Sequence, residues 1–381
     1  MKPKRLKLSK EPTSLKRITL MLVLAILYIT PFVFIPIGLY NDYFYAPKLF
    51  FYQGIVSLFL IIILWYRKKI ISSVSLDRID ALLVLFIISL TVATLLALDV
   101  RVAMLGNPRR VEGLATLLTY VILFMMARNM APLKQKHVNV LLALSLIIVL
   151  YGVLQTFGID PFPRDFIRGN WTRAFSTIGN PNFLGSFIVL LLPFTFDLYM
   201  RKQNKFGLLA YAILLYGLLA TMTRGTWIGA FFAVLIYLGI LWYQKQLYGS
   251  RFLVFIVVSI MVLLVYGFVS GDAFIARLLS LQTDLSKLIE NEAIEEVGSS
   301  RMFIWMRGMQ LFYKRPWFGY GPENVGLAFI KCFRSDLINK YGMLIVPDKA
   351  HNEYLHYALT GGIFTLLTYL GFIVLIIKKN M

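Results

Sequence analysis

Ten segments of this 381-residue sequence are apolar over about the 20 residues that a bilayer-spanning helix needs, and they constrain the fold more than any other feature. Hydrophobic residues make up 59% of the chain and charged residues 15%, whereas a soluble domain carries about 25% charged residues. We therefore predict an all-α fold, a polytopic transmembrane helical bundle. The predicted spans are residues 18–39, 48–66, 79–98, 113–127, 138–157, 183–199, 206–222, 226–241, 252–269 and 352–377.

The distribution of positive charge predicts the orientation of this bundle. A net charge of +20 would suggest nucleic-acid binding in a soluble protein, but in a membrane protein lysine and arginine flank the spans and fix their orientation. With the N-terminus inside, the inner segments carry 21 Lys and Arg residues and the four short outer loops carry 8. We expect a multi-pass protein of the cytoplasmic membrane with both termini in the cytoplasm and no nucleic-acid partner.

Spans and loops divide the chain into five predicted parts. Residues 1–17 are a basic cytoplasmic N-terminus, and residues 18–269 are a transmembrane bundle of about nine spans. Residues 270–350 are a long, mostly helical extracytoplasmic loop, because long segments cross the membrane largely regardless of their charge. Residues 351–377 are the last span, and residues 378–381 are a cytoplasmic tail.

Several arginines lie on the predicted outer side of the membrane, where the distribution of positive charge predicts few of them. These exceptions are informative about function. Their planar forks match phosphate geometry and stay charged when partly dehydrated, although contact with lipid headgroups would also explain several of them. Arg224 is the only charge in a turn of a few residues between two spans, so its charge is expected to face protein or ligand. The outer set is Arg109, Arg110, Arg164, Arg168, Arg173, Arg224, Arg301 and Arg307.

The outer loops contain further candidates for substrate binding. Ser299 or Ser300 is a possible cap for a helix from Arg301 to about Lys314, on which Arg301 and Trp305 share a face suited to a sugar phosphate. An interfacial helix anchored by Trp305 is the alternative. Asn182 is a predicted helix N-cap, and a helix N-terminus also attracts anions. We predict substrate contacts from Arg173, Asn180, Asn182, Trp305, Arg307, Tyr320, Asn352 and Glu353.

Two of the three histidines, His351 and His356, lie where the last apolar run begins. On one helix, five residue steps of about 100° would place them about 140° apart, too far to bind one ion. The third, His137, is distant, and Cys332 is the only cysteine, so we predict no metal site. A histidine with a near-neutral pKa suits a general base, and His351 is the candidate for that role. We interpret His356 as a structural, hydrogen-bonded histidine.

Four motifs together resemble the O-antigen ligase and polymerase family of membrane glycosyltransferases. They are G-N-P-N-F-L-G at 179–185, T-R-G-T-W-I-G at 223–229, the segment from R-M-F-I-W at 301–305 to G-Y-G-P-E-N at 319–324, and A-H-N-E-Y-L-H at 350–356. They occur in the family's order within about 173–370. Family members usually continue with further spans, whereas this sequence ends at Met381, so we expect either a truncated sequence or a short subgroup.

The resemblance implies an architecture of the GT-C type and a defined chemistry. The family transfers a glycan from an undecaprenyl-pyrophosphate carrier to a hydroxyl of a lipid, protein or glycan acceptor, on the outer face and without metal or another cofactor. It implies catalytic roles for Arg224, Arg301 and His351, with Arg224 and Arg301 expected at one pyrophosphate. The resemblance does not distinguish a ligase from a polymerase, and it does not identify the class of acceptor.

A transporter or flippase for lipid-linked glycans is the alternative function. Such a protein would show paired broken helices and a polar site at the membrane midplane, and the sequence shows neither. A non-catalytic membrane scaffold is a third reading, but it gives no reason for the series of outer arginines.

Overall fold

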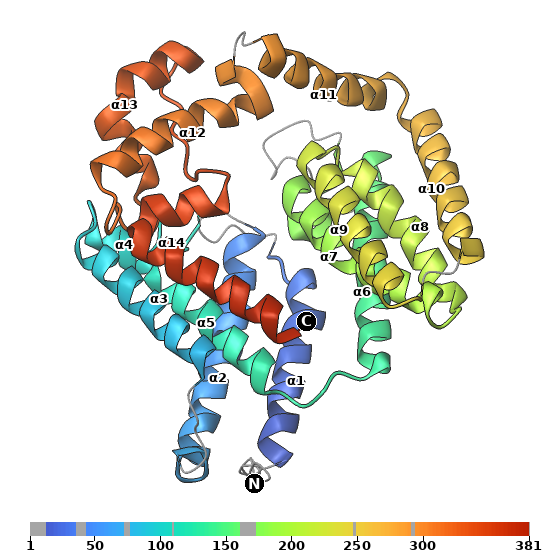
Figure 1. The fold of residues 1–381 in the computed structure, drawn as a ribbon, viewed down its shortest axis with the longest axis horizontal. Helices are drawn as coiled ribbons and strands as arrows, with labels where there is room; N and C mark the ends of the chain where they lie inside the picture. Colours follow the sequence, from blue (N-terminus) through green and yellow to red (C-terminus); the bar gives the residue numbers. More distant parts are fainter. Residues whose placement is uncertain are drawn as a thin grey trace. The chain divides into compact units, whose positions relative to one another are not determined.

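The computed structural model describes residues 13–35, 43–71, 77–108, 110–160, 173–246, 249–290 and 294–380, which are mainly helical and contain no strand (Figure 1). Eight helices in these ranges are long and apolar enough to cross a membrane, and two shorter apolar helices match the fourth and seventh predicted spans. The all-helical, multi-span fold is thus confirmed, while the number of spans remains a prediction. The helices are α1 Thr13–Ile29, α2 Tyr45–Ile71, α3 Arg78–Leu95, α4 Val100–Leu105, α5 Leu114–Asn129, α6 Gln135–Thr156, α7 Pro181–Met200, α8 Lys205–Ala220, α9 Arg224–Tyr243, α10 Gly249–Ser270, α11 Asp272–Glu290, α12 Val297–Lys314, α13 Val325–Tyr341 and α14 Glu353–Asn380, with short 3-10 turns at Thr30–Phe32, Ser176–Ile178 and Ile294–Glu296.

The first helix ends earlier than hydropathy alone predicts. Helix α1 stops at Ile29, and a 3-10 turn containing Pro31 follows it, whereas the predicted span continued to residue 39. A proline lacks the backbone N–H of a helix and disfavours helical geometry at the residue before it, so the apolar run outlasts the helix. The predicted end at residues 36–39 lies outside the described part of the chain.

The chain divides into two compact units, each made of segments distant in sequence. Unit 1 comprises Met1–Val23, Gln53–Ala131 and Asp284–Met381, and unit 2 comprises Leu24–Tyr52 and Pro132–Thr283. The five parts predicted from the sequence follow chain order, whereas the compact units do not.

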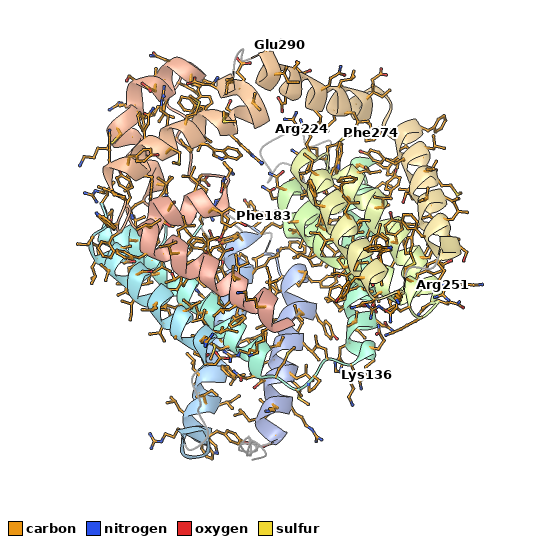
Figure 2. All side chains as sticks on the ribbon, in the orientation of Figure 1. Lys136, Phe183, Arg224, Arg251, Phe274 and Glu290 are labelled. Atoms are coloured by element: carbon orange, nitrogen blue, oxygen red, sulfur yellow. The ribbon has the colours of Figure 1, made fainter. Side chains whose placement is uncertain are left out.

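Unit 2 is built around helices α6 to α10, where α7 packs on both α8 and α9. Small residues allow these helices to approach closely, as is usual in membrane bundles. A Cβ atom added to Gly185 of α7 would lie 2.6 Å from Thr226 Oγ1 of α9, and one added to Gly217 of α8 would lie 2.2 Å from Val149 Cγ1 of α6. Figure 2 shows Arg224 and Phe274 at one end of this unit and Lys136 and Arg251 at the other.

Helices α3, α5 and α14 form the framework of unit 1. Ser89 of α3 and Thr365 of α14 share a buried hydrogen bond of 2.8 Å. At one end, Arg128 of α5 pairs with Asp77 at 2.5 Å and with Asp80 at 2.6 Å, where Asp77 caps α3. This clamp fixes α5 beside the start of α3.

Helix α14 is broken at Gly362, which has a φ angle of 73° and a ψ angle of −170°. The tight turn predicted after Lys314 fits into this break. The amides of Tyr320 and Gly321 donate to the carbonyls of Leu359 and Thr360 at 2.8 Å and 2.9 Å, and the Ile363 amide donates to the Pro316 carbonyl at 2.8 Å. The turn therefore satisfies backbone groups that the kink removes from the helical ladder, as a membrane environment demands.

Asn324 fastens the same turn to the connection between α3 and α4. Its side chain is fully buried, accepts from the Asp99 amide at 2.8 Å and donates to the Asp99 carbonyl at 3.1 Å. The G-Y-G-P-E-N segment thus joins three elements of unit 1. Its final asparagine has a structural function, because one buried side chain pairs with both the N–H and the carbonyl of Asp99.

The segment predicted as a long helical loop contains α11, α12 and α13, so its helical character is confirmed. Helix α12 begins at Val297, four residues before the predicted start. However, Gly298 and Ser300 each have a φ angle of 65°, so the regular helical turns begin at Arg301, close to the prediction.

Candidate functional site

A cluster of arginines surrounds the turn between α8 and α9 in unit 2. Arg173 Nε donates to the Thr221 carbonyl at 2.7 Å, and Arg173 Nη2 donates to Thr223 Oγ1 at 2.7 Å. Arg224, the first residue of α9, donates from Nη1 to the carbonyl and the hydroxyl of Ser280 at 2.8 Å and 3.0 Å. Arg173 and Arg224 are therefore held at one end of the same unit. We call them, with Arg277, the arginine cluster.

Arg277 of α11 is the member of this cluster that the sequence analysis missed. Its Nε donates to the Met222 carbonyl at 3.0 Å. Burial lowers the pKa of the Arg173 guanidinium, and the charge of Arg277 lowers it further. Phe274, Arg277 and Ser280 recur at the three-residue spacing of one helix face, and Phe274 is buried. That amphipathic periodicity of α11 was the available signal.

The N-cap role that the sequence predicted for Asn182 belongs to Asn180. Asn180, rather than Asn182, caps α7, because its Oδ1 accepts from the Asn182 amide at 2.8 Å and Pro181 takes the first helical position. A proline is favoured there because its missing N–H has no helical partner. Asn182 Oδ1 instead accepts from Thr223 Oγ1 at 3.3 Å and from Arg173 Nη2 at 3.4 Å, so Asn182 belongs to the rim of the arginine cluster.

The second group of charges lies in unit 1, beside the start of α14. Arg110 pairs with Asp348 at 2.6 Å, and Lys349 pairs with Glu112. The pKa of Lys349 is lowered to about 8, mainly by burial and also by the charge of Arg110, while Glu353 opposes the shift. With His351, Arg301 and Glu323, these residues form what we call the histidine cluster. Arg109, Arg164 and Arg168 lie outside the described residues.

His351 is held in a backbone conformation that few side chains adopt. Its φ angle is 50°, in the left-handed region, and α14 begins two residues later at Glu353. Desolvation lowers the pKa of the imidazole, the charges of Arg301, Arg110 and Lys349 lower it further, and Asp348 opposes them. The ring is therefore neutral near neutral pH while its residue remains exposed at the surface. An exposed, neutral imidazole beside cations is suited to accept a proton.

The segment carrying His351 is fixed to α12 by Trp305. The indole Nε1 donates to the Ala350 carbonyl at 2.9 Å, and Ala350 is fully buried. Asn352 also acts locally, because its Oδ1 accepts from the Leu355 amide at 3.2 Å in the first turn of α14. Trp305 and Asn352 thus position the histidine, and their predicted substrate contacts remain predictions.

Arg307 and Tyr320 have partners inside unit 1. Arg307 Nε lies 2.7 Å from Asp336 Oδ2, and the guanidinium lies 5.4 Å from the centre of the Phe303 ring. The Tyr320 hydroxyl donates to the Leu311 carbonyl at 3.1 Å, and its side chain is buried. These contacts support α12, α13 and the turn after α12. The contacts of Arg307 and Tyr320 with substrate stay predictions.

Glu323 is a titratable member of the histidine cluster that the sequence analysis did not select. Burial raises the pKa of its carboxyl group to about 7, while the Asn107 amide and the charge of Arg110 oppose the increase. Its φ angle is 58°, so Glu323, like His351, occupies the left-handed region. Its signal in the sequence was the position between Pro322 and Asn324 in a turn rich in glycine.

The sequence analysis used helix geometry to exclude a metal ion bound by both His351 and His356, and this argument does not hold. His351 precedes α14 rather than belonging to it, so the separation of about 140° around one helix does not apply. Nδ1 of His356 is buried without a hydrogen-bond partner, which contradicts the predicted hydrogen-bonded histidine at that atom. Among the residues described, no group of three or more His, Cys, Asp and Glu side chains is placed to hold a metal ion.

The helical fold and its apolar spans define a multi-pass membrane protein. Its two charged clusters lie at the ends of helices. Residues 209–370 match the family model described as O-Antigen ligase, so this segment of the chain is similar to that family. The match confirms the resemblance seen in the motifs. It contains Arg224, Arg301 and His351 and does not extend to Arg173, Asn180 or Asn182.

No curated protein and no solved structure matches the chain. The family match indicates an enzyme that transfers glycans, with a lipid-linked glycan and an acceptor as its general partners. It gives no support to the alternative of a transporter or flippase.

Proposed function

We propose that this protein transfers a glycan from an undecaprenyl-pyrophosphate carrier to a hydroxyl acceptor on the outer face of the cytoplasmic membrane, as a ligase or polymerase, without a metal ion. The observation that carries the proposal is His351, whose lowered pKa and exposed position beside Arg301 suit a general base. Its place within the family domain supports the assignment.

In the proposed reaction, neutral His351 accepts the proton of the acceptor hydroxyl. The hydroxyl oxygen forms a bond to the anomeric carbon of the glycan, and the bond from that carbon to the pyrophosphate oxygen breaks. The electron pair of the broken bond leaves with the carrier pyrophosphate. Each turnover thus forms one glycosidic bond and leaves one proton on the imidazole, which later passes to solvent.

Fixed arginines are proposed to stabilise the leaving group. Arg224 and Arg301 are the candidates from the sequence, and Arg173 and Arg277 join Arg224 in the arginine cluster. A guanidinium already oriented by hydrogen bonds needs little reorganisation as charge develops on phosphate, which is the general advantage of electrostatic preorganisation. Because a lysine cannot reproduce a bidentate contact, Arg224→Lys and Arg301→Lys are expected to keep the charge and lose much of the rate.

Two carboxylates compete with His351 for the role of base. Glu353 begins α14, and Asp348 forms an ion pair with Arg110 at 2.6 Å. That ion pair makes Asp348 the weaker rival, because accepting a proton would require it to give up a charged partner.

A transfer assay with purified protein, extracted lipid-linked glycan and several acceptors tests the proposal. We expect His351→Ala to lose about 10²–10⁴-fold in rate, Glu353→Gln to remain active and a chelator to leave the wild-type rate unchanged. Loss of wild-type transfer in chelator would refute metal independence. An inactive Glu353→Gln beside an active His351→Ala would reassign the base.

A further inference from the structure

The loop between α4 and α5 in unit 1, residues 106–113, is closed tightly on itself. Gly106 has a φ angle of 91°, and a Cβ atom added to it would lie 2.5 Å from Val111 Cα. A Cβ atom added to Gly113 would lie 2.4 Å from the Gly106 nitrogen, so the two ends of the loop meet where only glycine fits. The Asn107 carbonyl accepts from the Val111 amide at 2.7 Å. We call residues 106–113 the clasp loop.

Two charged side chains of the clasp loop reach the segment before His351. Arg110 Nη2 lies 2.6 Å from Asp348 Oδ2. Glu112 pairs with Lys349, from which it is separated by 237 positions in the sequence. The loop presents a positive and then a negative charge, and the segment a negative and then a positive one, so a slip by one residue would bring Arg110 against Lys349. Complementary charges in this order fix the register between the two parts of unit 1.

The clasp loop and Trp305 hold the same short segment at different atoms. The Trp305 indole fixes the main chain at Ala350, whose carbonyl accepts its N–H at 2.9 Å. The clasp loop fixes the side chains of Asp348 and Lys349, and His351 follows with a φ angle of 50°. A backbone in this left-handed region persists only where its surroundings impose it. The clasp loop is part of the surroundings that hold the histidine.

These two ion pairs are expected to affect the rate more than the stability. Their four side chains are between 20% and 47% exposed, and partly exposed ion pairs contribute little to the stability of a fold. A general base, in contrast, must lie within hydrogen-bond reach of the proton that it accepts. A displacement of about 1 Å can cost about 10²-fold in rate. A contact that matters little for folding can therefore matter greatly for proton transfer.

We propose that Arg110 and Glu112 are positioning residues for His351, which hold its imidazole where the acceptor hydroxyl gives up its proton. The proposal rests on the proposed function for the role of His351 as the base. For Arg110, the ion pair with Asp348 favours this role over contact with lipid headgroups, because the guanidinium is directed at a carboxylate of the protein.

Two carboxylate-to-amide substitutions break ion pairs at opposite ends of α5 and separate positioning from stability. Glu112→Gln breaks the pair with Lys349 beside His351. Asp77→Asn breaks the pair with Arg128 but keeps a side chain that can cap α3. We expect Glu112→Gln to lower kcat by about 10–10²-fold in the transfer assay with both KM values nearly unchanged, because positioning acts in the transition state. Asp77→Asn should keep the wild-type kcat.

The outcomes that contradict the proposal are a wild-type kcat in folded Glu112→Gln and an equal loss of kcat in Asp77→Asn. Thermal unfolding midpoints of the same samples show whether the variants are folded. The midpoint of Glu112→Gln should stay close to that of the wild type, since the pair with Lys349 is partly exposed.

Exchange of the two charges provides a rescue. Glu112→Lys and Lys349→Glu should each lower kcat at least as much as Glu112→Gln, because each places two like charges at the clasp loop. The double variant restores opposite charges, so we expect it to recover most of kcat. A double variant no faster than the single ones would overturn the proposal, and this comparison decides if Glu112→Gln fails to fold.

The reaction of His351 with diethyl pyrocarbonate, mapped by mass spectrometry, gives a readout that needs no turnover. His351 should react faster in Glu112→Gln because its ring is held less firmly, whereas His137 on α6 should react as in the wild type. Faster reaction at His351 without any glycan transfer by the wild type would keep the positioning role and reject the transferase. Transfer that depends on His351, with an unchanged reaction rate and kcat in Glu112→Gln, would keep the transferase and reject the positioning role.

Discussion

At the scale of single residues, His351 and Glu323 share an unusual property. Each has a non-glycine side chain in the left-handed backbone region, at φ angles of 50° and 58°, and each has a shifted pKa. Such conformations cost about 1–3 kcal/mol and persist only where the surrounding structure imposes them. Here the surroundings are known: Trp305 holds the segment before His351, and Asn324 holds the turn after Glu323.

The lowered pKa of His351 predicts the acid side of the pH–rate profile. A general base must be neutral, so kcat/KM should fall with decreasing pH only below about 6.5, the ordinary value for histidine. Asp348→Asn removes the carboxylate that raises the His351 pKa, so the fall should move to still lower pH. Asp272→Asn, on exposed α11, is the control and should leave the profile in place. A shift toward higher pH in Asp348→Asn would contradict the role of His351.

Glu323 predicts a pH dependence of stability. Its folded-state pKa, raised to about 7, lies above that of an unfolded chain, so the protonated carboxyl stabilises the fold and this contribution is lost as pH rises through about 7. Glu323→Gln mimics the protonated form. We expect its thermal unfolding midpoint to exceed that of wild type by a few degrees at pH 8 and to match it at pH 5. An equal change at both pH values would show that ionisation of Glu323 is not the cause.

Candidate residues could be found from the sequence where a charge breaks a general rule. Arg224 stood out because it is the only charge in a short turn between two spans, and Arg173 because it lies on the side where few positive charges are expected. Arg277 did not stand out, because one arginine on an amphipathic helix is ordinary. The pairing of Lys349 with Glu112 was equally hidden, since the two are 237 residues apart and only folding joins them.

At the scale of elements, hydropathy located the helices within a few residues except at the end of α1, and it did not reveal the break in α14. A Gly-Gly pair in an apolar run is tolerated by a helix, so the sequence gives no sign that Gly362 takes a φ angle of 73°. The break depends on the inserted turn at Pro316–Gly321, whose hydrogen bonds come from a distant segment. Similarly, Asn180 rather than Asn182 caps α7 because Pro181 favours the first helical position.

The break predicts a sharp difference between two glycines. A Cβ atom at Gly362 would lie 2.0 Å from the Trp317 carbonyl oxygen and would require a backbone conformation that L residues avoid. We expect Gly362→Ala to destabilise the protein by about 3 kcal/mol or more and to lower its thermal unfolding midpoint. Gly239→Ala in α9, where a Cβ atom would meet nothing within 4 Å, should leave the midpoint unchanged or slightly raised. Equal midpoints for the two variants would argue against the inserted turn.

At the scale of the whole molecule, orientation in the membrane is a prediction from charge. A cysteine at exposed Ser335 on α13, in a Cys332→Ser background, should react with an impermeant maleimide in intact cells. A cysteine at exposed Lys202, in the loop between α7 and α8, should react only after lysis. The reverse pattern would place the proposed active side in the cytoplasm.

Arg224 and Arg301 are predicted from the sequence to act on one pyrophosphate. If Arg224 and Arg301 act on the same pyrophosphate, the effects of Arg224→Lys and Arg301→Lys on kcat/KM should not add, with a coupling of about 1 kcal/mol or more. Arg334→Lys, at an exposed site on α13, combined with Arg224→Lys provides the additive control. Full additivity in the first pair would indicate that the two arginines act on different groups.

The hydrogen bond between Ser89 and Thr365 has a consequence for biosynthesis. These residues are 276 positions apart, and they join α3 to α14. At about 5–20 residues per second, the ribosome adds α14 roughly 10–60 s after α3 has been made. During that interval α3 lacks α14, its main helical neighbour. The Ser89 hydroxyl also lacks its hydrogen-bond partner on α14, Thr365. Unit 1, and with it the histidine cluster, therefore forms only after α14 has been made.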